Sequence, residues 1–272
     1  MDEEKYYSKN LEVFTGTVGD AIVASGSIGG IEATEKHLFS SMLFARICTA
    51  SVSLLSLSPT IVINKATKHW DGSICLGIAR SILEHVMHFN YLGIEDVEDS
   101  EWKARLKLVQ LFDCSERIRL FSHIPHAEKE LEGFRQIQSE LRYELYENDY
   151  FSKLDPKYQR KLAKGKTASF LSREEMITRL GYERGALKYF YMLTSSNIHA
   201  SPLNYYRMPD DRRGSGVKNS VDIGYTGMAL EESSRLISLA TEKLKNQFSH
   251  LVEFPDLEFD WELISGSETN TP

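Results

Sequence analysis

Hydrophobic residues recur every three or four positions along most of the chain, the spacing of one face of an α-helix. The clearest run lies at residues 71–92, where one side carries only apolar residues: Ile78, Ile82, Leu83, Val86 and Phe89. Asp71 begins this run and Gly93 ends it, as helix-capping residues do. The pattern therefore predicts a long, mostly apolar helix in the core.

The same spacing predicts further helices at 35–58, 100–123, 127–150, 172–180, 183–199 and 226–251. Thr34 and Ser100 stand where N-caps belong, and Ser172 with Glu175 has capping-box spacing. The helix at 35–58 is expected to present one apolar face, formed by Leu38, Met42, Ala45, Thr49, Val52 and Leu55. No alternation of strand type is long enough for a sheet, so the fold class is all-α, an elaborated antiparallel helical bundle.

The predicted division of the chain has three parts. Residues 1–32 form an N-terminal extension, 33–252 the helical bundle domain, and 253–272 an acidic C-terminal segment ending in a disordered tail from 265. The extension contains a short helix at 5–14 and a glycine-rich stretch at 15–30. No Gly-Lys-Ser/Thr follows that stretch, which disfavours a phosphate loop and leaves a flexible cover or a small-residue helix contact.

Between the last two predicted helices, residues 203–225 read as a loop that is either a functional lid or disordered. The three cysteines, Cys48, Cys75 and Cys114, lie far apart in helical contexts, as small buried hydrophobic residues do. No Cys-x-x-Cys pair and no second Glu-x-x-His is present, so no metal and no cofactor are expected.

The composition is that of a soluble globular protein, with 42% hydrophobic residues among 272 and a net charge of −7. An acidic chain needs a concentrated basic face to bind nucleic acid. We expect no apolar run to reach the roughly 18 residues of a membrane span, and the acidic N-terminus does not resemble a signal peptide. We therefore expect a cytoplasmic protein with no membrane contact.

The residues best suited to catalysis or ligand binding lie on the predicted helix at 71–92. Arg80, Glu84, His88 and Tyr91 follow one line of that helix, and His85 lies at its border. Such a stripe is either an Arg80–Glu84 ion pair with packing histidines, or a site in which the arginine neutralises a phosphate and a histidine moves a proton.

Two basic segments are the other candidates. We expect Lys157, Arg160 and Lys161 in the first, and Arg212 and Arg213 in the second, to contact an RNA backbone. The alternative for the first segment, which runs from 152 to 170, is an ordinary solvated surface connection.

Arg80, four residues and then His85, in a helical bundle, resembles the RNA-cleaving HEPN superfamily. The resemblance implies metal-independent RNA hydrolysis, with Arg80 on the scissile phosphate and His85 as acid or base. It also implies a homodimer, because such sites usually form between two protomers.

A second resemblance covers residues 38–251. The segments Arg80-Ser81-Ile82-Leu83-Glu84 and Ser195-Ser196-Asn197-Ile198-His199 resemble signatures of a bacterial all-helical family of unknown function. The resemblance implies that Arg80, Glu84 and His199 belong together, with Ser195 one turn before His199. Some members of that family occur beside phage-defence genes.

Two hypotheses follow. In one, the protein acts on RNA as a metal-independent endoribonuclease of phage defence or stress response, with Arg80, Glu84, His85 and His199 catalytic. In the other, it is a non-enzymatic interaction or sensor protein, the Arg/Glu/His network is structural, and the 203–225 loop or the acidic tail binds a protein partner.

Overall fold

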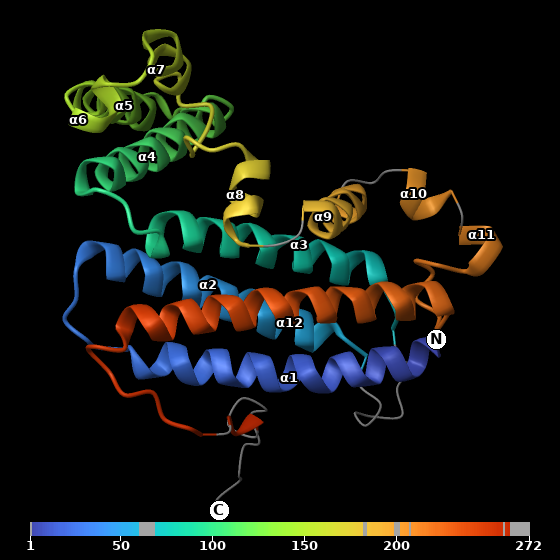
Figure 1. Cartoon of the computed structure of the whole chain (residues 1–272). Helices are drawn as coiled ribbons and strands as arrows, with labels where there is room; N and C mark the ends of the chain where they lie inside the picture. The colour runs from blue at the N-terminus through green and yellow to red at the C-terminus, as the bar shows by residue number, and fades with distance from the viewer. Residues whose placement is uncertain are drawn as a thin grey trace, which may run out of the picture. The chain divides into compact units, whose positions relative to one another are not determined.

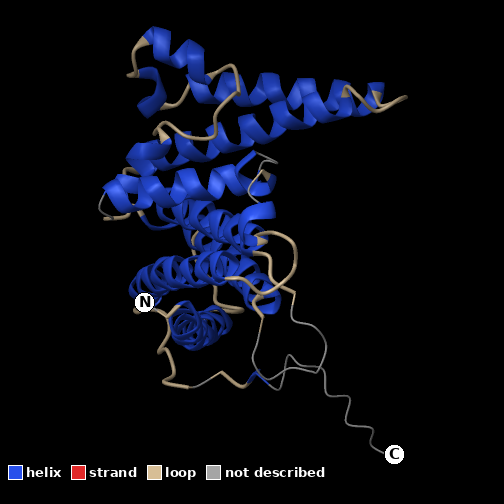
Figure 2. Ribbon diagram, turned by 90° about the vertical axis from the view of Figure 1, so that its right-hand side faces the viewer, coloured by secondary structure: helices blue, strands red, loops and turns tan. Residues whose placement is uncertain are grey.

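The computed structural model describes residues 2–59, 69–181, 184–198, 202–206, 208–257 and 259–261. Within these ranges every regular element is a helix, and one isolated antiparallel bridge joins Trp70 to Gly216. Figure 2 shows the helices in blue joined by tan loops. The predicted all-α fold class is therefore confirmed, while the predicted disordered tail, 265–272, lies outside the described residues.

The chain forms two compact units, one comprising residues 1–94 and 180–272 and the other residues 95–179. This division differs from the one expected from sequence, where a single bundle ran from 33 to 252. The first 32 residues belong to the body of the first unit, and the second unit is an insertion into its chain.

The first unit contains α1 (Glu3–Ser27), α2 (Glu35–Leu57), α3 (Gly72–His88), the π-helical segment η1 (Phe89–Ile94), α9 (Arg184–Ile198), α10 (Pro202–Tyr205), α11 (Met208–Asp211) and α12 (Ser220–Phe248). The long α12 packs along α1 and α3, and α2 and α9 both pack against α3 (Figure 1). Thr34 caps α2 and Asp71 caps α3 through their side chains, as the sequence predicts.

The N-terminal segment is one long helix, so the expected short helix at 5–14 is wrong in its extent. Phe14 and Val18 of α1 are fully buried. A Cβ atom at Gly227 of α12 would lie 2.7 Å from the Tyr6 ring, so the glycine lets α1 and α12 approach closely. The glycines at 15–30 make no such helix contact: a Cβ atom at Gly16 or Gly26 would meet nothing within 4 Å, and one at Gly19 would meet Phe259 of the C-terminal segment. Because α1 runs to Ser27, most of this stretch is helix rather than a flexible cover.

The apolar face predicted for α2 is the wrong one. The buried residues are Ser40, Phe44, Ile47, Cys48, Ser51 and Leu54, whereas Leu38 and Met42 remain 57% and 54% exposed. α2 is apolar on both sides, so periodicity alone cannot choose between them. By length and hydropathy α2 would also suffice to cross a membrane, contrary to the expectation that no such segment exists. Core helices of soluble proteins pass the same test.

The segment 203–225 is more ordered than the predicted loop. It contains α10 and α11, and α12 begins at Ser220 rather than near 226. The buried carboxylate of Asp222 accepts hydrogen bonds from the backbone N–H groups of Gly72 and Gly214, at 3.3 and 2.9 Å. These bonds tie the segment to the start of α3.

The second unit contains α4 (Asp99–Phe121), α5 (Glu128–Tyr146), α6 (Asp149–Ser152), α7 (Pro156–Leu162) and α8 (Arg173–Arg179). Its core joins α4 and α5 to α6 and α7 through Leu108, Leu111, Leu145, Phe151 and Leu162. Ser172 and Glu175 form the predicted capping box at α8, because each side chain accepts from the other's backbone N–H. The three cysteines of the chain are buried and unpaired, as predicted.

Candidate functional sites

The first site is centred on Arg80, which α3 carries into the first unit. Arg80 is only 7% exposed and faces α9. Its Nε and Nη2 donate to Oε1 of Glu84, one turn along α3, at 3.1 and 2.8 Å. The structure therefore forms the i,i+4 ion pair that the sequence spacing predicts.

The remaining donors of Arg80 point at α9. Nη1 donates to the Tyr191 carbonyl at 3.4 Å and to Oγ of Ser195, and Nη2 also donates to the Tyr191 hydroxyl. The guanidinium carbon lies 3.5 Å from the centroid of the Tyr191 ring. A guanidinium has five N–H donors, and all five of these are engaged within the protein.

Ser195, one turn before His199 in the sequence, accepts a hydrogen bond from Arg80, while His199 itself lies outside the described residues, so its predicted approach to Arg80 and Glu84 stays a prediction. Tyr191, which contacts Arg80 through its carbonyl, its hydroxyl and its ring, is not among the predicted site residues. A tyrosine four residues before Ser195, on the same helical line, was the available signal, since i and i+4 share a face.

The histidines of α3 lie beside the Arg80 network without joining it. Nδ1 of His85 donates to the Ser81 carbonyl at 2.6 Å, so the ring folds back onto its own helix. His88 is half-buried, and burial lowers its pKa below the ordinary histidine value; the charge of Glu84 opposes this shift and His85 adds to it. Among the described residues, no hydrogen bond links either imidazole to Arg80.

Because all five donors of Arg80 are hydrogen-bonded within the protein, this cluster has little capacity to bind a ligand. The Arg80 guanidinium can bind a phosphate only if it first releases Glu84, Tyr191 or Ser195. The Glu84 side chain is 44% exposed, so the cluster reaches solvent through its carboxylate rather than through its cation. Within the described ranges, no three metal-ligating side chains gather anywhere.

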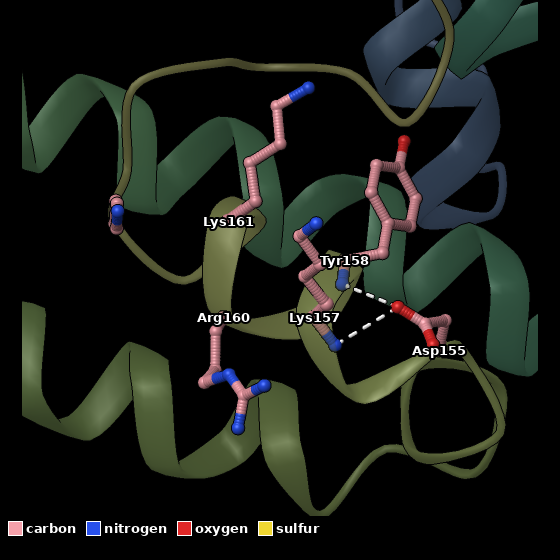
Figure 3. A pocket seen from close by; sticks show the side chains of 6 residues that line it. Asp155, Lys157, Tyr158, Arg160 and Lys161 are labelled. Carbon is pink, nitrogen blue, oxygen red and sulfur yellow. Dashed lines mark hydrogen bonds between the residues drawn. The ribbon is translucent and has the colours of Figure 1, made fainter.

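The second site is a cationic pocket of about 600 Å³ on α7 in the second unit (Figure 3). Four of its lining side chains are cations: Lys157, Arg160, Lys161 and Lys164. Lys157, Arg160 and Lys161 are spaced by three and four residues within α7, and Lys164 follows the end of the helix. The first three are the predicted RNA contacts, and Lys164 belongs to the same basic segment at 152–170.

The pocket is held by a rigid frame. Asp155 caps α7 by accepting from the backbone N–H groups of Lys157 and Tyr158, both at 3.0 Å. The Tyr158 hydroxyl donates to the Phe170 carbonyl at 2.5 Å, and the Gln159 amide donates to three carbonyls that precede α7. Backbone positions under the cations are therefore fixed while the cations stay exposed.

The cations of this pocket have no counter-charge of their own. In the part of the chain that the structure describes, none of the four forms an ion pair. The lining carboxylate, Asp155, is occupied as the α7 cap. Like charges at i,i+4 destabilise a helix by a few tenths of a kcal/mol per pair, and Lys157–Lys161 is such a pair within α7.

The other predicted RNA contacts lie in the first unit and do not line this pocket. Arg212 follows α11, is exposed and has a φ of 59°. Its carbonyl accepts from Oγ of Ser215 and from the side-chain amide of Asn219, which shapes the turn before α12. Arg213 is half-buried in the same turn.

Comparison with known proteins gives one match. The model of a family described as a family of unknown function (DUF5677) matches residues 37–215, a range that contains both Arg80 and α7. This match confirms the resemblance to a helical family of unknown function, and it leaves the HEPN resemblance a prediction. Neither the curated proteins nor the solved structures contain a match to the chain.

Proposed function

The chain belongs to this family of unknown function, DUF5677, and we propose from its own geometry that it binds RNA through the α7 pocket. In this proposal the Arg80 cluster is a clamp that holds α9 on α3. The protein is then an RNA-binding helical protein whose buried arginine stabilises the fold, rather than one that uses this arginine on a phosphate.

The observation that carries the proposal is the set of four exposed, unpaired cations on one fixed surface. Phosphate backbones are recognised by such clusters, and each Lys or Arg that neutralises a phosphate releases a condensed counterion. The net charge of −7 makes the rest of the chain unfavourable for a polyanion, so binding is expected to be confined to this pocket.

The saturation of Arg80 supports the division of roles. A phosphate clamp needs donors that are free to turn to the ligand, and an arginine whose five donors are all engaged within the protein has none to spare. The metal-independent ribonuclease stays a prediction, because His199 and its surroundings lie outside the described residues.

RNA binding is tested by fluorescence anisotropy with a labelled single-stranded 20-mer over a series of salt concentrations. The triple variant Lys157→Ala/Arg160→Ala/Lys161→Ala removes three pocket cations. For single strands each lost phosphate contact lowers the slope of log affinity against log salt by about 0.7, so the slope is expected to fall by about 2.

The matched control is Lys9→Ala/Lys129→Ala/Arg135→Ala, which removes the same charges from exposed positions outside the pocket. It is expected to retain the wild-type slope. Equal losses in both triple variants, or no binding by the wild type at 50 mM salt, would refute the proposal. Incubating the same RNA with wild type, Arg80→Ala, His85→Ala and His199→Ala in EDTA tests cleavage, and wild-type cleavage lost in folded variants would establish the ribonuclease instead.

A further inference from the structure

The α7 pocket concentrates positive charge in a short stretch of the chain. Residues 153–166 carry six Lys and Arg and one Asp, whereas the rest of the second unit carries ten Lys and Arg and sixteen Asp and Glu. A strand of RNA that continued beyond the pocket would meet the negative field of the rest of the unit. The charge distribution therefore favours a ligand whose negative charge is confined to the pocket.

The cations are also closely spaced. Lys157 and Lys161 are one turn apart on α7, a rise of about 6 Å. Figure 3 shows the Lys161 side chain above and the Arg160 side chain below that of Lys157. Successive phosphates of one strand lie about 3.4 Å apart along a duplex axis, so this stretch would face about two backbone charges. A terminal polyphosphate, with its phosphate groups linked directly, presents more charge in the same space.

The pocket offers little surface on which bases could stack. Proteins that bind an unpaired strand along its length combine a basic groove with aromatic faces for successive bases. In the described lining the single aromatic side chain is Tyr158, whose hydroxyl donates to the Phe170 carbonyl and whose ring packs on the core of the second unit. The lining thus suits phosphate groups better than a run of bases.

A tight turn holds the fourth cation, Lys164. Gly165 follows it with a φ of 67°, and a Cβ atom at this glycine would collide with Oγ of Ser115 on α4. On the other side, the Ala163 carbonyl accepts a hydrogen bond from Nε of Arg142 on α5, at 2.9 Å. The backbone around Lys164 is therefore fixed before a ligand arrives, which reduces the entropy lost on binding.

The size of the pocket and the source of its donors agree with these features. A volume of about 600 Å³ lies within the range of small-ligand pockets. Asp155 occupies the N–H groups of Lys157 and Tyr158, so the ligand contacts come from the cationic side chains. We infer that the α7 pocket binds a terminal polyphosphate, supplied by the 5′ end of an RNA, in preference to phosphates within a strand. This inference rests on the RNA binding proposed above and names the part of the RNA that is recognised.

The test is fluorescence anisotropy of one RNA 20-mer, labelled at its 3′ end and carrying a 5′-hydroxyl, a 5′-monophosphate or a 5′-triphosphate. The full chain is expected to bind the triphosphate form about tenfold more tightly than the hydroxyl form, the gain of one charge-assisted hydrogen bond. Lys157→Ala/Arg160→Ala/Lys161→Ala is expected to lose this preference, and Lys164→Ala to reduce it. The control Lys9→Ala/Lys129→Ala/Arg135→Ala is expected to keep it.

RNA length separates recognition of an end from recognition of a strand. A 6-mer with a 5′-triphosphate is expected to bind as tightly as the triphosphate 20-mer, because both present the same end. Equal affinity of the three 20-mers overturns the inference and leaves RNA binding in place, and so does a tenfold weaker triphosphate 6-mer. A preference that survives in the pocket triple variant also overturns it.

Two further outcomes concern the proposed function. No binding of any RNA form overturns both RNA binding and the inference built on it. Competition with ATP distinguishes a free nucleotide from an RNA end, because both carry the same linked phosphates. Unlabelled triphosphate 20-mer is expected to displace the labelled form at a lower concentration than ATP. Equal displacement by ATP would support the polyphosphate site and overturn RNA as the source of its ligand.

Discussion

Arg80 and Arg160 are the same residue type in opposite situations. Arg80 is buried, and its five donors are shared among Glu84, Tyr191 and Ser195. Arg160 is exposed beside three lysines, and none of the four has an ion pair in the described part of the chain. A cation whose donors are exhausted internally stabilises the fold, whereas one without partners is available to a ligand.

The comparison shows that a motif does not by itself indicate whether a cation has donors free for a ligand. Arg80 has the spacing to a histidine that suggests phosphate chemistry, yet its surroundings leave it no donor for a phosphate. The α7 cations belong to no motif, yet they share one pocket on a rigid helix. Availability of donors, rather than residue type or spacing, separates the two regions.

The largest expected effect is on stability. Arg80→Ala removes hydrogen bonds to a carboxylate, two hydroxyls and a carbonyl and leaves a void between α3 and α9, so the free energy of unfolding should fall by about 3 kcal/mol. Arg160→Ala should change it by less than about 0.5 kcal/mol, because the side chain is exposed. Urea denaturation followed by circular dichroism measures both, and equal losses would abolish the distinction between the two regions.

Part of this picture was readable from sequence, and the rest depends on tertiary contacts. The caps Thr34, Asp71 and Ser172 and the Arg80–Glu84 pair were predictable because they are local, set by spacing within one helical turn. Tyr191 lies 111 residues from Arg80, so no spacing within a single helix predicts their contact.

Two other differences have separate causes. The buried face of α2 was mispredicted because apolar residues surround that helix, and packing against α1, α3 and η1 decides which side is covered. The length of α1 was underestimated because glycines at 16, 19 and 26 lower helix propensity, whereas burial of residues such as Phe14 outweighs it.

A smaller effect concerns pH. Because burial lowers the pKa of His88 in the folded chain, the unfolded chain binds the proton more readily. The stability contributed by neutral His88 is complete above the unfolded histidine pKa of about 6.5 and declines as the pH falls from there towards the lower folded value.

Removing the titrating group isolates this contribution from that of other histidines. His88→Gln should show a shallower loss of stability between pH 7 and pH 5 than wild type, measured by urea denaturation at each pH. His126→Gln, at an exposed turn in the other unit, is the control and should follow the wild-type curve. An unchanged slope for His88→Gln would mean that its burial does not discriminate between the two protonation states.

The smallest effect is the most specific for the α7 pocket. Lys157→Glu converts the like-charge pair with Lys161 into an attractive i,i+4 pair and places the carboxylate in the first turn of α7, where the helix dipole favours it. The second unit should therefore gain about 0.2–0.5 kcal/mol at low salt and nothing at 1 M salt. The same substitution should weaken RNA binding, because it places a carboxylate among the pocket cations. A gain in stability with a loss of binding would mean that these cations lower the free energy of unfolding of the second unit while they contribute to RNA binding. A loss of stability would instead mean that the Lys157 side chain has a structural role, and Lys157 would then resemble Arg80 rather than differ from it.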